Sequence, residues 1–128
     1  MIQDALVARI TADAGMHALI QDRVYALLAP QGVRSPYLVY TNVATHREST
    51  YCASDLMQQA MYQFDSYSKN YREALLVAKA LKLCLLDFEG AMGDTHVASV
   101  KLENESELLD PDPGLYRVLT TLIIWHEV

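Results

Sequence analysis

The residues of this sequence that could perform catalysis lie in one polar stretch, residues 45–55. His46, Glu48 and Cys52 stand close together there, and a Cys–His pair can provide a thiolate nucleophile with its base. Such a nucleophile also needs a rigid support and an oxyanion-binding site, which a polar loop alone does not supply. We therefore expect no catalysis from these residues.

Histidines and acidic residues are the groups that could bind a metal ion. None of the four histidines has a second histidine three or four residues away, the spacing that places two ligands on one helix face. Carboxylates recur between Glu103 and Asp112, but this segment lacks the glycine that the turn of an EF-hand loop requires. We expect a solvated acidic segment, with no bound metal ion and no cofactor.

The short motifs of common enzyme classes are missing from the sequence. It contains no GxGxxG, GxxxxGK[ST], GxSxG or HExxH pattern. Its two cysteines, Cys52 and Cys84, form no CxxC pair and are far apart, so we expect two reduced thiols. The sequence thus predicts a protein that is not an enzyme.

Tyrosine is the unusual residue, with eight copies. Many fall in predicted strands, where aromatic residues pack in the core and across neighbouring strands. A second interpretation is a protein interface, because tyrosine buries a large area while its hydroxyl tolerates water. Tyr51, in the polar stretch, is the best candidate for that second role.

Length and composition limit the classes of protein to which this chain can belong. A chain of 128 residues fits one domain, residues 1–128, and 52% hydrophobic against 20% charged residues excludes disorder as its main state. The net charge is −6 and the basic residues are scattered, which argues against a tight grip on nucleic acid. No signal-peptide run and no apolar stretch of about 18 residues occurs, so we expect a soluble protein made in a cytoplasm, with no membrane partner.

Two segments have the three-and-four spacing of apolar residues that is typical of amphipathic helices. The first, residues 2–14, is short and is expected to stop at Gly15. The second, residues 69–88, is expected to be the main helix, capped by Ser68 and ended by two later glycines.

Alternation of apolar and polar residues predicts strands at residues 58–66 and 97–104, while β-branched and aromatic residues predict a strand at residues 37–43, which Pro36 is expected to begin. The predicted strands are residues 37–43, 58–66, 97–104 and 116–127. The last is apolar on both alternating sets, as expected of a central strand or of one covered on both sides. Together these elements predict an α+β fold: an antiparallel sheet of about four strands with one long helix packed on it and a short N-terminal helix.

Several local segments, in this order, have a familiar form. They are residues 21–25 (QDRVY), 29–32 (APQG), 35–40 (SPYLVY), 64–67 (FDSY), 113–117 (PGLYR) and the closing Trp125-His126. In that order and at this length, the chain resembles the tail-completion, or head-to-tail joining, proteins of tailed bacteriophages and prophages.

That resemblance implies a structural role. Proteins of this family are ring-forming subunits, commonly hexameric, at the head-proximal end of the tail, which they complete and join to the head. The implied partners are further copies of the chain, the tail tube and the head connector, with DNA passing through without specific binding. The implied location is the virion tail, after assembly in the bacterial host cytoplasm.

No catalytic residue follows from the resemblance. Loop residues are the expected contacts with other subunits. These candidates are Arg47, Glu48, Tyr51, Asp110 and Asp112.

Two other classes stay open on the sequence alone. A small enzyme or ligand-binding α+β domain would have a pocket with convergent polar groups, lined by His46, Glu48 and Cys52. A host-side adaptor would form a dimer and not a ring.

Overall fold

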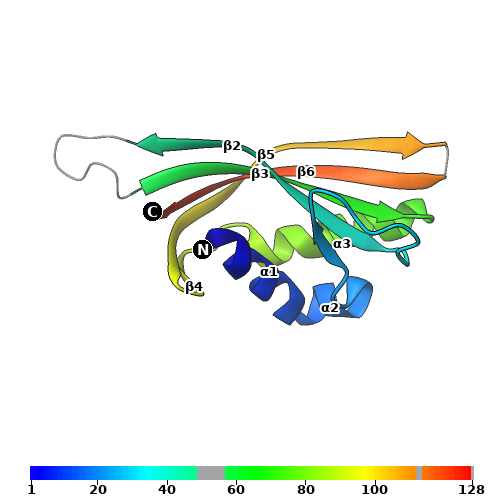
Figure 1. The fold of residues 1–128 in the computed structure, drawn as a ribbon, viewed down its shortest axis with the longest axis horizontal. Helices are drawn as coiled ribbons and strands as arrows, with labels where there is room; N and C mark the ends of the chain where they lie inside the picture. The colour runs from blue at the N-terminus through cyan, green and yellow to red at the C-terminus, as the bar shows by residue number, and fades with distance from the viewer. Residues whose placement is uncertain (49–56, 112–113, 128) are drawn as a thin grey trace.

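The structure, a computed structural model, consists of a curved sheet with helices against one of its faces (Figure 1). It describes residues 1–48, 57–111 and 114–127. The elements in chain order are α1 (Ile2–Ala12), α2 (Ala14–Ile20), β1 (Val24–Ala26), β2 (Tyr37–Glu48), β3 (Met57–Ser68), α3 (Tyr71–Leu85), β4 (Gly90–Met92), β5 (Thr95–Asp110) and β6 (Leu115–Glu127).

The sheet has six strands in the order β1-β2-β3-β6-β5-β4. β1 pairs with β2 in parallel, and every other neighbouring pair is antiparallel. β6 lies between β3 and β5, which confirms the central strand predicted from the apolar run at residues 116–127.

The predicted fold class is wrong in strand number, strand direction and helix length. The sheet is a mixed, curled sheet of six strands, not an antiparallel one of about four, and the helices are short. β1 and β4 escape sequence analysis because each has three residues, too few to show a two-residue period. β1 makes the sheet mixed because it pairs in parallel with β2.

Two strands are much longer than their patterns predict. β2 continues to Glu48, so the predicted loop at residues 45–55 begins as strand, and its remaining residues 49–55 lie outside the described residues. β5 continues to Asp110 through a run of charged side chains that sequence patterns associate with loops. Strand pairing overrides that preference here, because β6 is a full-length partner for β5.

The main helix, α3, is shorter than the predicted 69–88 and has a different cap. Asn70 precedes it with extended backbone, and the Asn70 side chain accepts a hydrogen bond from the Glu73 amide at 3.1 Å. Ser68 instead ends β3, where its Oγ donates to Glu73 Oε1 at 2.7 Å and accepts from the Asn70 amide at 3.0 Å. The Ser68 cap prediction is therefore wrong by two residues.

The N-terminal segment is two helices and not one. The chain turns at Asp13, whose backbone is extended and whose side chain accepts a hydrogen bond from the Met16 amide. Gly15, the predicted stop, lies inside α2. The break comes two residues earlier because Asp13 satisfies a free amide at the start of α2.

The core lies between α3 and the sheet face that it covers. Val77, Leu81 and Leu85 belong to one buried cluster together with Val100 of β5 and two residues of β6, Leu122 and Ile124. This packing confirms which side of the predicted helix faces the sheet. Among the described residues, no helix has the length and apolar character needed to cross a membrane.

Candidate functional site

The structure separates the predicted contact residues into two groups at opposite ends of the sheet. Arg47 and Glu48 end β2, where their backbones pair with Gln58 and Met57 of β3. Asp110 ends β5 and pairs with Leu115 of β6. Tyr51 and Asp112 lie outside the described residues.

These two ends are long hairpin arms that point in opposite directions (Figure 1). The arm of β2 and β3 extends past the helices on one side, and the arm of β5 and β6 extends past them on the other. The molecule therefore presents two separate ends to other proteins, both supported by the same sheet.

The sheet face away from the helices, here called the open face, has no helix of the described chain packed on it (Figure 1). Every second residue of β3 and β6 points to it, and most of these residues are half-buried, whereas Asp65 is buried and Glu127 is exposed. Met61 lies beside Ile123 there, and Leu119 and Trp125 lie in the same row of β6. A half-exposed apolar surface of this kind is typical of proteins that bind other proteins.

One polar cluster stands on the open face. Arg117 Nη2 donates to the Asp65 carboxylate at 2.9 Å, and the Gln63 amide donates to the same carboxylate at 3.0 Å. The Arg117 guanidinium also lies 5.5 Å from the centre of the Tyr67 ring, which stacks on Tyr37 at 4.9 Å. The cluster joins β2, β3 and β6 by side chains as well as by the backbone.

Burial and charge act against each other in this cluster. Burial alone would lower the pKa of Arg117, but the hydrogen bond and the negative charge of Asp65 raise it above its ordinary value. Burial raises the pKa of the Tyr67 phenol, which therefore stays neutral at physiological pH. The pair is an ion pair with one buried partner, and it has no free base for catalysis.

An apolar groove of about 450 Å³ borders this cluster. It lies between the loop after β1 and the end of the β5–β6 arm, where Asp110 and Leu115 pair, with Tyr37 and Tyr67 also in its wall. Leu27 and Leu28 on its rim are 71% and 82% exposed. Leu27 is held there with φ of 65°, while its amide donates to the Tyr40 carbonyl at 2.9 Å.

A smaller cavity of about 230 Å³ lies at the other end, beside the start of α1. His126 Nδ1 is 2.8 Å from the Glu127 carbonyl, and a carbonyl can only accept, so this nitrogen carries the proton. His126 Nε2 and the Tyr62 hydroxyl, both buried in this region, have no hydrogen-bond partner among the described residues.

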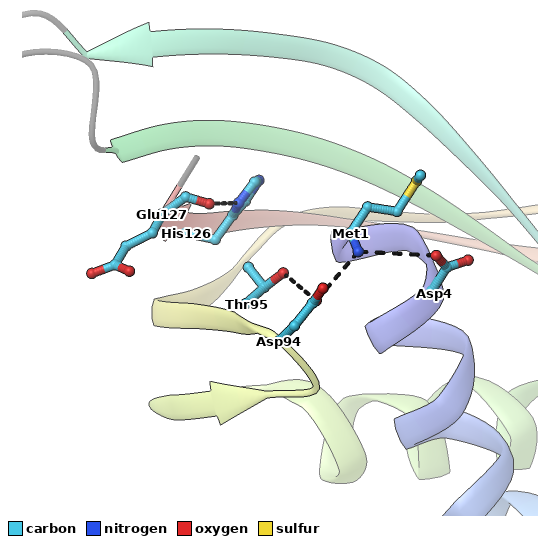
Figure 2. A network of polar contacts seen from close by, with 6 residues as sticks. All are labelled: Met1, Asp4, Asp94, Thr95, His126 and Glu127. Atoms are coloured by element: carbon cyan, nitrogen blue, oxygen red, sulfur yellow. Dashed lines mark hydrogen bonds and ion pairs between the residues drawn. The ribbon is translucent and has the colours of Figure 1, made fainter.

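Figure 2 shows how the chain start is held near this cavity. The Met1 amino group lies 3.3 Å from Asp94 and 3.9 Å from Asp4, and the Thr95 hydroxyl donates to Asp94 at 3.3 Å. The hydrogen bonds and charge of the amino group lower the pKa of Asp94. These contacts are exposed and attach α1 to the turn between β4 and β5.

Of the three residues from which the sequence could build an enzyme's pocket, the structure describes the side chain of His46 alone. His46 is exposed on β2, and the two cavities described above are lined by other residues. Cys52 lies outside the described residues. Within the described ranges, no three His, Cys, Asp or Glu side chains are grouped as metal ligands.

Sequence reasoning missed the Asp65–Arg117 cluster. The tyrosine interpretation did anticipate cross-strand packing, since Tyr37 and Tyr67 are direct partners on β2 and β3. A polar Asp65 within an alternating strand was the available signal, but its partner is 52 residues away along the chain. Such a partner cannot be identified without knowing that β3 and β6 are neighbours.

The fold of this chain is shared with a protein of known structure. A chain of a solved structure described as "Virion of native gene transfer agent (GTA) particle" matches with a TM-score of 0.84 and 14% identity, over 99% of this chain and 95% of that chain. At this identity the match shows a shared fold. No curated protein matches the sequence.

A family model matches nearly the whole chain. It is the model described as "Tail completion protein gp17", and it covers residues 4–127, including all six strands and both hairpin arms. The chain therefore belongs to the tail completion protein gp17 family.

Proposed function

We propose that this structural tail protein forms a ring at the head-proximal end of a phage or phage-like tail, where it completes the tail tube and joins it to the head. The observation that carries the proposal is the pair of hairpin arms that extend from opposite ends of one sheet (Figure 1). A joining protein must hold two different partners apart and fixed relative to each other. One continuous sheet between two arms meets that need.

Each arm then has its own partner. The β2 strand of one arm ends in Arg47 and Glu48, with Tyr51 three residues later in the sequence, and the β5 strand of the other ends at Asp110, with Asp112 two residues later. We assign one group to the tail tube and the other to the head connector, because long connections with polar ends serve as contact sites. A head-to-tail contact closes into a hexameric ring when each subunit is rotated by about 60° from the last.

The charge of the chain suits a passage for DNA. With a net charge of −6 and scattered basic residues, a ring would let DNA pass without holding its phosphates. Assembly would take place in the host cytoplasm, with no catalytic step. Replacing His46 and Cys52 by alanine is therefore expected to leave assembly intact.

Particles that lack this protein provide the direct test. Electron microscopy should show tails that are overlong, or heads and tails that stay separate, and adding the purified protein back should restore joined particles. Joined tails of normal length in its absence would contradict the proposal.

A further inference from the structure

The two margins of the sheet each leave a length of strand with an unused backbone edge. β4 pairs with β5 only at residues 95–97, and β1 pairs with β2 only at residues 38–40. Among the residues that the structure describes, residues 101–110 of β5 and 41–48 of β2 have no strand on their outer side, while the outer carbonyl of Val100 accepts from the Asp87 amide at 3.0 Å. Open edges of this length bind further strands unless something prevents it.

We propose that the β5 edge of one subunit pairs with the β2 edge of a second copy of this chain, so that the sheets continue from subunit to subunit. The proposal rests on the ring function proposed above and names the contact that would build the ring. The occupant of each edge is thus a copy of the same protein.

Strand direction favours this pairing. β3 is antiparallel to β2, β6 to β3 and β5 to β6, so β2 and β5 run in opposite directions. If a second copy stands beside the first in the same orientation, its β2 is antiparallel to β5 of the first. Copies in the same orientation are what a ring requires.

The two free edges also lie at the same level of the sheet. Asn42 pairs with Tyr62, Tyr62 with Leu122, and Leu122 with Leu102. The same path across the sheet leads from His46 through β3 and β6 to Ser99. Neighbouring copies can therefore pair near Asn42 and Leu102 without a shift along the strands, and a longer pairing moves β2 along β5 towards Asp110, away from the carbonyl of Val100 that Asp87 occupies.

Charge favours unlike edges over like edges. Residues 99–110 contain four carboxylates and one lysine, whereas the opposite margin, residues 23–48, contains three arginines and one carboxylate, Glu48. Within the subunit Lys82 pairs with Glu105 at 2.7 Å, which leaves Glu103 and Glu107 without an ion pair among the described residues. Two β5 edges would bring like charges together, which destabilises a strand pair.

Exposed apolar side chains flank both edges. Leu102 on β5 and the nearby Leu83 on α3 are 45% and 78% exposed, and both line one shallow surface depression. Val43, which bulges from β2, is 52% exposed, and Leu27 follows β1 on the same margin. Contact between the two margins would bury these side chains.

Cysteine cross-linking tests the pairing. In a Cys52→Ser background, Lys101→Cys on β5 is combined with Thr41→Cys, Ala44→Cys or His46→Cys on β2, all on the open face. Cys84 can stay, because burial raises the pKa of its thiol to about 11 and makes it unreactive. Each variant is first checked for a native circular dichroism spectrum.

The expected result is a cross-link between unlike edges in one of the three registers. A Lys101→Cys chain is mixed with a chain that carries one of the β2 cysteines, either as concentrated protein or in purified tails. Under mild oxidation, the mixture should give at least ten times more covalent dimer than either chain alone. A chain that carries both cysteines should give a ladder of products that stops at a closed ring.

Two results would overturn the strand pairing and leave the ring function standing. One is a covalent dimer from Lys101→Cys alone, which would mean that β5 pairs with β5. The other is rings seen by electron microscopy with no cross-link in any register. Normal joined tails without the protein would instead contradict the ring function itself.

A charge variant gives a second measurement. Glu103→Lys should reduce the cross-link between unlike edges at least threefold at low salt, because it removes the charge contrast between the edges. Asp4→Lys, the same charge change on the exposed part of α1, is the matched control and should leave the yield within twofold. Equal loss in both variants would contradict the assigned edges.

Discussion

Arg117 on β6 donates a hydrogen bond to Asp65 on β3 at 2.9 Å, on the open face of the sheet. The Asp65 side chain is 6% exposed and that of Arg117 is 26% exposed, so the carboxylate depends on the guanidinium for its neutralisation. Tyr67 and Gln63 complete its surroundings. The pair links two neighbouring strands, β3 and β6, at a place where Arg117 also pairs with Leu108 of β5.

Arg117→Leu should lower the free energy of unfolding by about 2–4 kcal/mol at neutral pH, because it leaves the Asp65 charge buried without a partner. Urea denaturation measures the effect. The double variant Arg117→Leu with Asp65→Leu should recover most of the loss, since it removes both charges. A single variant as stable as the natural protein would contradict the assigned role of the pair.

Leu81→Ala should lower the free energy of unfolding by about 2–5 kcal/mol, because Leu81 is fully buried between α3 and the sheet. Leu83→Ala on the same helix is the matched control. Its side chain is 78% exposed, so its cost should stay within about 0.5 kcal/mol in the isolated subunit. Similar costs for both variants would mean that α3 faces the sheet differently.

Asn70→Ala should cost about 0.5–2 kcal/mol of stability, because it removes the acceptor that caps the first turn of α3. Asn70→Asp keeps an acceptor and should retain most of the stability. Thermal melts should rank the stability of the three proteins, with the natural protein first, Asn70→Asp next and Asn70→Ala last. Equal loss from Asp and Ala would contradict the cap.

The protein should lose stability as the pH rises above about 9. Burial raises the pKa of the Tyr62 phenol and raises that of the Cys84 thiol from 9.0 to about 11. A group whose pKa is raised on folding contributes its full stability below its unfolded pKa and loses it as the pH approaches the folded value. Urea denaturation between pH 8 and pH 11 measures this loss.

Tyr62→Phe measures how much the Tyr62 phenol contributes to the loss of stability at high pH. The variant should have nearly natural stability at pH 7, because the Tyr62 hydroxyl is buried and has no hydrogen-bond partner among the described residues. It should then lose less stability than the natural protein between pH 9 and pH 11. A curve for the natural protein that stays flat to pH 11 would exclude this linkage.

The sequence by itself determined the family and the main elements. Alternation located β3 and the first half of β5, because a strand with one buried face has a period of two residues. Aromatic and β-branched residues located most of β2, and the long apolar run located β6 at the centre of the sheet. The spacing of apolar residues in α3 located its buried face, although Asn70 and Leu86 end it earlier than the pattern does. Local periodicity is read from neighbouring residues, so these features need no knowledge of the whole fold.

Only the tertiary structure decided the sheet order, the two short strands and the surfaces offered to other proteins. β1 and β4 exist because β2 and β5 give them an edge to bind, and three residues carry no period of their own. The Asp65–Arg117 pair and the two open edges depend on which strands become neighbours across dozens of residues of chain. That choice is made by packing and backbone pairing over the entire sheet, which no local pattern records.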